Sequence, residues 1–204
     1  MRICFLCQEY PPEVQGGGIG TYTYTLARAL ARGGHRVHVV ARAQREPFTR
    51  EEEGVVVHRI TLPQDLLRSA ARPLTGPQSF LDAYAYSRVA AERARRDGIE
   101  VVAIMTPNAD HAPQASACLE AGLDVICDKP LAASLEEGRA LAATVRRTGR
   151  LFVLTHNYSA YPMVHQARAM VRAGAIGAVR QIHLTYVQGH NATLVEATPE
   201  GRTW

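Results

Sequence analysis

The chain contains a single lysine, Lys129, among 23 basic residues, and every other one is an arginine. A lysine ammonium is a compact charge whose pKa can shift, whereas the arginine guanidinium is a planar fork that stays protonated. A chain that uses arginine wherever a generic positive charge suffices is expected to place lysine where arginine would fail. Proton transfer at a substrate oxygen is chemistry of that kind. A lysine left by chance is the structural alternative.

Polar side chains also follow three neighbouring strands that the apolar runs predict. Ligands of doubly wound sheets bind at the carboxyl ends of the strands, so we expect these side chains to border one crevice. A lone Asn or His is more often a turn or capping residue, and only Lys129 favours function by itself. The residues at the three strand ends are Asn108 and His111, then Lys129, then His156 and Asn157.

A glycine-rich segment, Gly16-Gly17-Gly18-Ile19-Gly20, lies between the first predicted strand and the first predicted helix. Glycines there let a backbone approach a phosphate, and a helix N-terminus attracts the anion. A dinucleotide fingerprint would place glycines directly after the strand and an acidic residue at the end of the second strand. Here Glu9 to Gln15 intervene, and the second strand ends at Ala41-Arg42. Phosphate contact through Gly17, Gly18 and Gly20 and a flexible turn both stay open.

The four cysteines, Cys4, Cys7, Cys118 and Cys127, are too few for a disulfide framework in a chain of this length. Cys4 and Cys7 have the spacing of a redox pair but lie in an apolar run that predicts a strand. Residues three apart on a strand point to opposite faces, so we interpret them as structural. We expect no metal cofactor.

Near-continuous apolar runs alternate with amphipathic segments, which is typical of a parallel sheet covered on both faces. We therefore predict an α/β fold: a doubly wound, mostly parallel Rossmann-like sheet, followed by the start of a truncated α+β C-terminal domain. The predicted strands are 2–8, 36–41, 55–62, 100–106, 124–127, 151–155 and 179–188, and the predicted helices are 21–32, 80–97, 112–121, 135–147 and 161–173.

The composition is that of an ordinary globular protein, with 47% apolar and 21% charged residues in 204. Because no stretch of 18 apolar residues occurs, we expect no membrane span, and the first apolar run is too short for a signal peptide, which favours the cytoplasm. The net charge of +4 is scattered. Without an aromatic-interleaved basic stripe, the sequence predicts no nucleic-acid partner.

Residues 1–99 resemble the start of family 4 glycosyltransferases. The resemblance rests on Glu9-Tyr10-Pro11-Pro12, on the glycine-rich segment ending in Thr21, and on the stretch from Leu26 to His35 with Val37-His38-Val39-Val40. It implies the acceptor-side domain of the GT-B architecture, whose glycine-rich loop faces a sugar nucleotide. The donor-binding second domain of that family lies outside this sequence.

Residues 99–204 resemble the Gfo/Idh/MocA family of NAD(P)-dependent oxidoreductases. The resemblance rests on Val101 to Asn108 with His111, on Ala121 to Leu131 with its Asp-Lys-Pro motif, and on His156-Asn157-Tyr158. It implies NAD or NADP as cofactor and a sugar-like or cyclitol hydroxyl as substrate. The family's own glycine fingerprint is missing, and its later Asp and His fall beyond Trp204.

The oxidoreductase resemblance also implies site roles. Lys129 would be catalytic, beside the nicotinamide and the reacting hydroxyl. The implied substrate residues are His156, Asn157 and Tyr158, and the implied cofactor residues are Thr106, Pro107, Asn108, His111, Asp128 and Pro130.

The chain as a whole is interpreted as a natural or artefactual fusion in three parts, 1–99, 100–158 and 159–204. The strands of the first two parts could share one sheet, and the third part would begin the truncated C-terminal domain. Three functions compete: an oxidoreductase fragment with weak or no activity of its own, a glycosyltransferase-like protein that uses a sugar nucleotide, and a non-catalytic folded remnant. The predicted strand 179–188 leaves an edge through which two copies could pair as a homo-oligomer.

Overall fold

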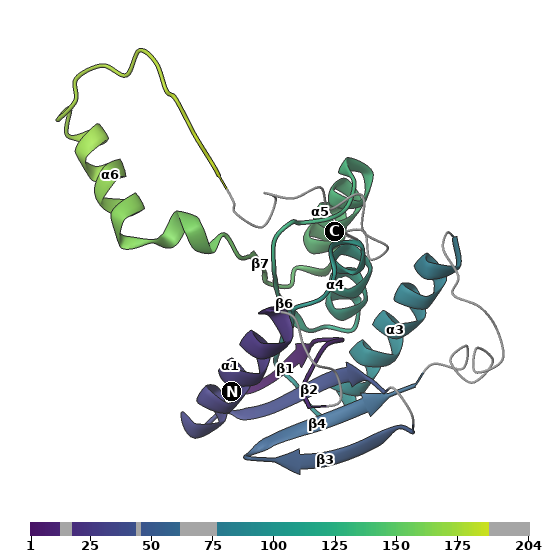
Figure 1. Ribbon diagram of the computed structural model, residues 1–204. Helices are drawn as coiled ribbons and strands as arrows, with labels where there is room; N and C mark the ends of the chain where they lie inside the picture. Colours follow the sequence, from purple (N-terminus) through teal and green to yellow (C-terminus); the bar gives the residue numbers. More distant parts are fainter. Residues whose placement is uncertain (13–17, 44–45, 62–76, 188–204) are drawn as a thin grey trace, which may run out of the picture. The chain divides into compact units, whose positions relative to one another are not determined.

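The computed structural model describes residues 1–12, 18–43, 46–61 and 77–187 (Figure 1). The chain divides into two compact units, Met1–Thr155 and His156–Trp204. Among the described residues, no helix has both the length and the apolar character needed to cross a membrane. The glycines Gly16 and Gly17 lie outside the described residues.

The first unit contains one sheet of seven strands in the order β3-β4-β2-β1-β5-β6-β7. All neighbours run parallel except β3 and β4. Strands from both halves of the chain therefore share one sheet, and the predicted doubly wound, mostly parallel fold is confirmed. The strands are β1 (Arg2–Leu6), β2 (Arg36–Arg42), β3 (Phe48–Glu52), β4 (Val55–Ile60), β5 (Val101–Ile104), β6 (Asp124–Cys127) and β7 (Phe152–Leu154).

Strand β3 was not expected from the sequence. It pairs antiparallel with β4 at the edge of the sheet, and its central residues Thr49, Arg50 and Glu51 are exposed. The hairpin turns at Glu53 and Gly54, which both have positive φ, 48° and 79°, as a type I′ turn requires. An exposed edge strand buries no apolar face, so it leaves no alternating pattern in the sequence.

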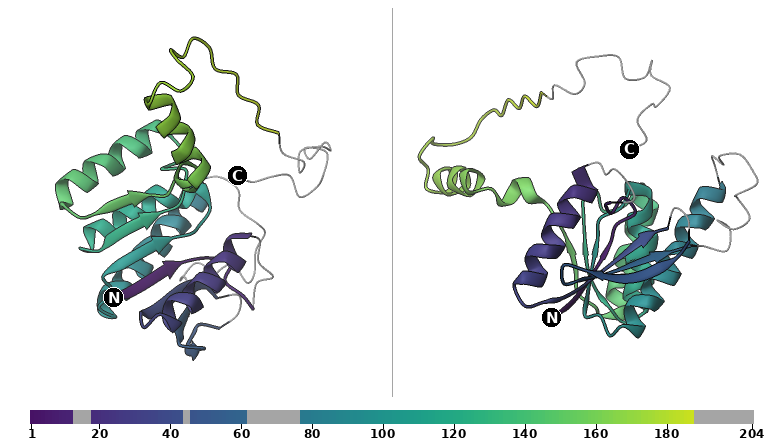
Figure 2. Two further views of the ribbon diagram at one scale, coloured as in Figure 1. Left: turned by 90° about the vertical axis from the view of Figure 1, so that its left-hand side faces the viewer. Right: turned by 60° about the horizontal axis from the view of Figure 1, so that its bottom comes forward.

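Helices cover both faces of the sheet (Figure 2). Helix α1 contributes Ala27, Leu26 and Leu30 to the core on one face. The opposite core includes Tyr86 of α3, Leu119 of α4 and Leu141 of α5. Helix α1 lies on the opposite face from α3, α4 and α5 because the chain reverses its direction of winding between β1 and β5. These helices are α1 (Gly18–Arg32), α3 (Pro77–Arg96), α4 (His111–Glu120) and α5 (Leu135–Thr148).

The cysteines occupy the places expected of structural residues. Cys4 belongs to the core under α3, α4 and α5, whereas Cys7 belongs to the core under α1. All four cysteines are buried and free. Cys4 and Cys7 therefore face opposite sides of the sheet, which excludes a redox pair between them.

The second unit contains the short 3-10 helix η2 (Asn157–Ala160) and helix α6 (Pro162–Arg172), close to the predicted helix 161–173. The strand predicted at 179–188 is wrong as far as the structure describes it: residues 179–187 are exposed and form no strand. An alternating segment becomes a strand only when a second strand satisfies its backbone groups, and the described part of this unit contains none. The described residues 179–187 therefore offer no strand edge through which two copies of the chain could pair.

Candidate functional site

The point where the winding reverses lies between β1 and β5, which are direct neighbours in the sheet. Open α/β sheets bind their ligands outside the carboxyl ends of the strands at such a point. Two side chains meet there: the Gln8 Nε2 donates a hydrogen bond of 2.6 Å to Asp110 Oδ2. Gln8 follows β1, and Asp110 ends the 3-10 helix η1 (Asn108–Asp110) that follows β5. This contact joins the two strand ends directly.

Asp110 is a buried carboxyl group. Burial raises the pKa of Asp110, and the hydrogen bond from Gln8, the nearby His111 and Arg42 all act in the opposite direction. The Gln8 bond thus compensates part of the cost of holding a carboxylate away from water.

His111, the first residue of α4, is buried beneath the strand ends, with 1% of its surface exposed. Its Nε2 is 2.8 Å from the carbonyl oxygen of Thr106, and its Nδ1 is 2.6 Å from that of Pro130. Carbonyl oxygens only accept, so the ring nitrogen that carries a proton donates it to its carbonyl oxygen. His111 therefore ties the end of β5 to the segment beyond β6.

The Thr106 hydroxyl also forms a hydrogen bond in the protein interior. Its side chain is buried and donates a hydrogen bond of 3.1 Å to Gln114 Oε1 on α4. Pro107 is exposed and Asn108 is half-buried, so these two residues, rather than Thr106 and His111, present surface at the end of β5.

Asp128 anchors the Asp-Lys-Pro segment beyond β6. Its Oδ1 accepts hydrogen bonds from the Lys129 backbone N–H at 2.9 Å and from the Thr155 hydroxyl at 2.6 Å. Thr155 follows β7, so the two neighbouring strand ends are tied together. The Lys129–Pro130 peptide bond is cis. The Lys129 side chain is exposed, and Pro130 is half-buried.

The two described glycines of the predicted phosphate loop differ in their surroundings. A Cβ at Gly20 would lie 2.1 Å from the carbonyl oxygen of Glu9, so this glycine is required by the packing of α1 against the chain beyond β1. A Cβ at Gly18 would meet nothing within 4 Å. Gly18 is exposed at the start of α1 and is therefore open to a ligand, whereas Gly17 lies outside the described residues.

His156, Asn157 and Tyr158 are exposed residues of the second unit. Tyr158 stacks edge-on with Tyr161, with ring centroids 5.6 Å apart. The substrate role that the sequence resemblance implies for these three residues stays a prediction.

Sequence reasoning missed four residues that build the site: Gln8, Asp110, Gln114 and Thr155. Gln8 and Thr155 directly follow apolar runs at strand ends, the same signal that identified Asp128 and Lys129. Asp110 lies between two predicted site residues, Asn108 and His111. Gln8 and Asp110 are 102 residues apart, and Thr155 lies 27 residues from Asp128, so no local pattern indicates these pairings.

The fold agrees with comparisons to known proteins. Residues 18–156 match the Gfo/Idh/MocA family, described as an oxidoreductase family with an NAD-binding Rossmann fold. The chain belongs to this family. The match begins at residue 18 and so covers most of the segment that resembles glycosyltransferases. The oxidoreductase relationship therefore extends well before residue 99, where the sequence resemblance began.

Individual relatives point the same way. An uncharacterized oxidoreductase of Bacillus subtilis is 43% identical over 109 residues, covering 53% of this chain and 28% of the relative. The levoglucosan dehydrogenase of Pseudarthrobacter phenanthrenivorans is 36% identical over 126 residues, covering 54% and 32%. An oxidoreductase structure from Sinorhizobium meliloti has a TM-score of 0.53 and 32% identity, covering 88% of this chain and 43% of that one. The chain spans about a third or less of these two curated relatives.

Proposed function

We propose that the carboxyl ends of the strands around Lys129 form the active site of an oxidoreductase. It transfers a hydride between NAD or NADP and a hydroxyl-bearing carbon of a sugar-like or cyclitol substrate. One observation carries the proposal. The only lysine of the chain is exposed directly beyond β6, while its backbone N–H is held by Asp128 Oδ1 at 2.9 Å. A fixed backbone with an accessible ammonium suits a group that must meet a substrate oxygen reproducibly.

The residues at the start of α1 fit the phosphates of a dinucleotide. Gly18 leaves the backbone open, and the first turn of α1 contains no acidic residue that would repel an anion. Pro107, Asn108 and Asp128 would border the nicotinamide, with Thr106 and His111 holding the wall behind them. When bound, the nicotinamide supplies the hydride acceptor or donor. Because β2 ends at Arg42, where an acidic residue would favour NAD, both cofactors belong in any test.

Lys129 handles the proton in this proposal. During oxidation of an alcohol, the carbon would give its hydride to the nicotinamide, and the hydroxyl proton would leave through Lys129. During reduction, the Lys129 ammonium gives a proton to the new alkoxide. His156, Asn157 and Tyr158 are proposed to hold the substrate. The relative named levoglucosan dehydrogenase supports the sugar-like class.

The test is thermal unfolding of the 204-residue chain, alone and with NAD, NADH, NADP, NADPH, UDP-glucose or GDP-mannose. A ligand at about 100 times its Kd adds about 2.7 kcal/mol to the free energy of unfolding, which corresponds to a shift of several degrees. We expect a shift with a nicotinamide cofactor and weak or no turnover from this chain alone. A shift only with a sugar nucleotide would favour the glycosyltransferase-like alternative. A cooperative transition whose midpoint no ligand shifts would contradict both enzyme functions and support the non-catalytic folded remnant.

Matched glycine variants locate the binding site. Gly18→Ala adds a methyl group in open space and is expected to leave the unfolding temperature unchanged while removing the cofactor shift. Gly138→Ala is the control, because Gly138 lies in α5 rather than at the start of α1 and its Cβ would make an ordinary contact of 3.5 Å with the Leu131 side chain. A cofactor shift that survives Gly18→Ala would argue against phosphate contact at α1.

A further inference from the structure

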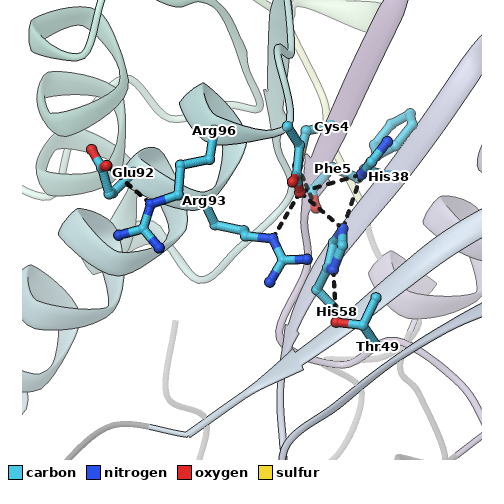
Figure 3. A network of polar contacts seen from close by, with 9 residues as sticks. Cys4, Phe5, His38, Thr49, His58, Glu92, Arg93 and Arg96 are labelled. Carbon is cyan, nitrogen blue, oxygen red and sulfur yellow. Dashed lines mark hydrogen bonds and ion pairs between the residues drawn. The ribbon is translucent and has the colours of Figure 1, made fainter.

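Three side chains that can bind metal ions meet on the face of the sheet that α3 covers (Figure 3). His38 comes from β2, His58 from the neighbouring β4, and Asp97 directly follows α3. His38 Nδ1 and His58 Nε2 are 2.9 Å apart. Asp97 Oδ2 lies 3.6 Å from His38 Nδ1 and 3.3 Å from His58 Nε2. Both histidines are buried.

These separations suit one small divalent cation. Zinc binds imidazole nitrogen and carboxylate oxygen at about 2.0–2.2 Å, so the ligand atoms of a tetrahedral site are about 3.4 Å apart. The three observed distances, 2.9, 3.3 and 3.6 Å, lie on both sides of that value. An ion above the triangle of donor atoms would therefore reach all three with shifts of a few tenths of an ångström, and its fourth position would remain for water.

The neighbour of His58 on β3 favours a ring tautomer that can bind a metal ion. Its Nδ1 is 3.0 Å from the Thr49 hydroxyl, which can accept the ring proton and leave the lone pair on Nε2. Burial lowers the pKa of His58 to about 4 and also lowers the pKa of His38.

Arg93 opposes a bound cation. Its Nε donates a hydrogen bond of 2.8 Å to the same Asp97 Oδ2, and both Arg93 and Arg36 bring positive charge near His38. The Arg93 side chain is 37% exposed, so it can move into solvent and release the carboxylate oxygen. Arg93 and a metal ion would thus compete for one atom.

We propose that His38, His58 and Asp97 form a binding site for a first-row divalent cation of the zinc type. Two imidazoles and one carboxylate favour zinc, cobalt or nickel over magnesium and calcium, which prefer oxygen ligands alone. The ligands come from β2, β4 and the end of α3, so a bound ion would clamp that helix to the sheet. This site is independent of the proposed oxidoreductase function.

The test measures zinc and cobalt binding to the 204-residue chain by isothermal titration calorimetry, with visible absorption of Co²⁺ as a second readout. We expect one ion per chain. His58→Gln and Asp97→Asn are expected to weaken binding by about 100-fold or more, since even the loss of an outer partner costs about 10–100-fold. His165→Gln is the matched control, because His165 is an exposed residue of α6.

Arg93→Met keeps the proposal falsifiable if a ligand variant fails to fold. It removes the competing hydrogen bond and one positive charge, so it is expected to tighten zinc binding by about tenfold, within the range of outer-partner effects. Absence of binding to the parent chain would overturn the proposal. So would binding that survives both ligand variants, binding lost in His165→Gln, or an Arg93→Met affinity that is unchanged or weaker.

Discussion

The carboxamide of Gln8 donates a hydrogen bond of 2.6 Å to the carboxylate of Asp110, and this contact joins the chain beyond β1 to the chain beyond β5. These two strands flank the point where the sheet reverses its winding. One residue further along, His111 extends the connection to Pro130, beyond β6. Three adjacent strand ends are therefore held together by two side chains that follow one another in the sequence.

The Asp110 carboxyl makes stability depend on pH. Burial raises the pKa of Asp110 above its unfolded value of 3.8, so the folded state retains its proton to higher pH than the unfolded state. Stability from this group is present at low pH and is lost as the pH rises through the raised pKa. Asp110→Asn is expected to stabilise the fold at pH 7 and to lose that advantage as the pH approaches 3.8.

Urea unfolding of both proteins between pH 4 and pH 8 measures this effect. Gln8→Ala provides a second measurement, because it removes the hydrogen bond that lowers the pKa of Asp110. It should destabilise the fold at pH 7, and Asp110→Asn should then stabilise the Gln8→Ala variant more than it stabilises the parent. A difference between Asp110→Asn and the parent that does not vary with pH would contradict the prediction.

His111→Ala should be among the most damaging single substitutions in the first unit. It removes contacts of 2.6 and 2.8 Å to two carbonyl oxygens and leaves a buried cavity. We expect a loss of about 3–5 kcal/mol in the free energy of unfolding, the size typical of broken buried networks. Chemical denaturation measures it, with the exposed His165→Ala expected to change stability by less than about 0.5 kcal/mol. A small effect at His111 would remove its positioning role.

The four cysteines are expected to be unreactive in the folded chain. Burial raises the pKa of Cys118 and of Cys127 to about 12, and it raises the pKa of Cys4 and Cys7 as well. Since the thiolate is the nucleophile, a thiol reagent at pH 8 should label none of them rapidly and all four after denaturation. Fast labelling of the native chain, or a disulfide between Cys4 and Cys7, would contradict their structural assignment.

Gly20→Ala should destabilise the fold where Gly138→Ala does not. The new methyl group would meet the Glu9 carbonyl oxygen at 2.1 Å, a backbone atom that cannot swing away, whereas at Gly138 it meets only a leucine methyl at 3.5 Å. Overpacking of this kind costs about 1–3 kcal/mol. Thermal unfolding of the two variants checks it, and equal unfolding temperatures would show that α1 can shift without cost.

The sequence by itself determined the doubly wound sheet, because buried parallel strands and amphipathic helices leave periodic patterns within a few residues. The same local rule separated Cys4 from Cys7 and identified Lys129 at a strand end. The strand β6 was predicted at its observed bounds, Asp124–Cys127.

Tertiary structure decided what depends on partners far along the chain. Strand β3 exists because β4 offers it an edge, and residues 179–187 form no strand because no described strand of their unit pairs with them. The contacts between Gln8 and Asp110, and among His38, His58 and Asp97, join residues that no local pattern connects. Hydrogen bonds and ligand sets form wherever the fold brings polar atoms within about 3 Å, so the strand order, rather than the spacing in the sequence, selects them.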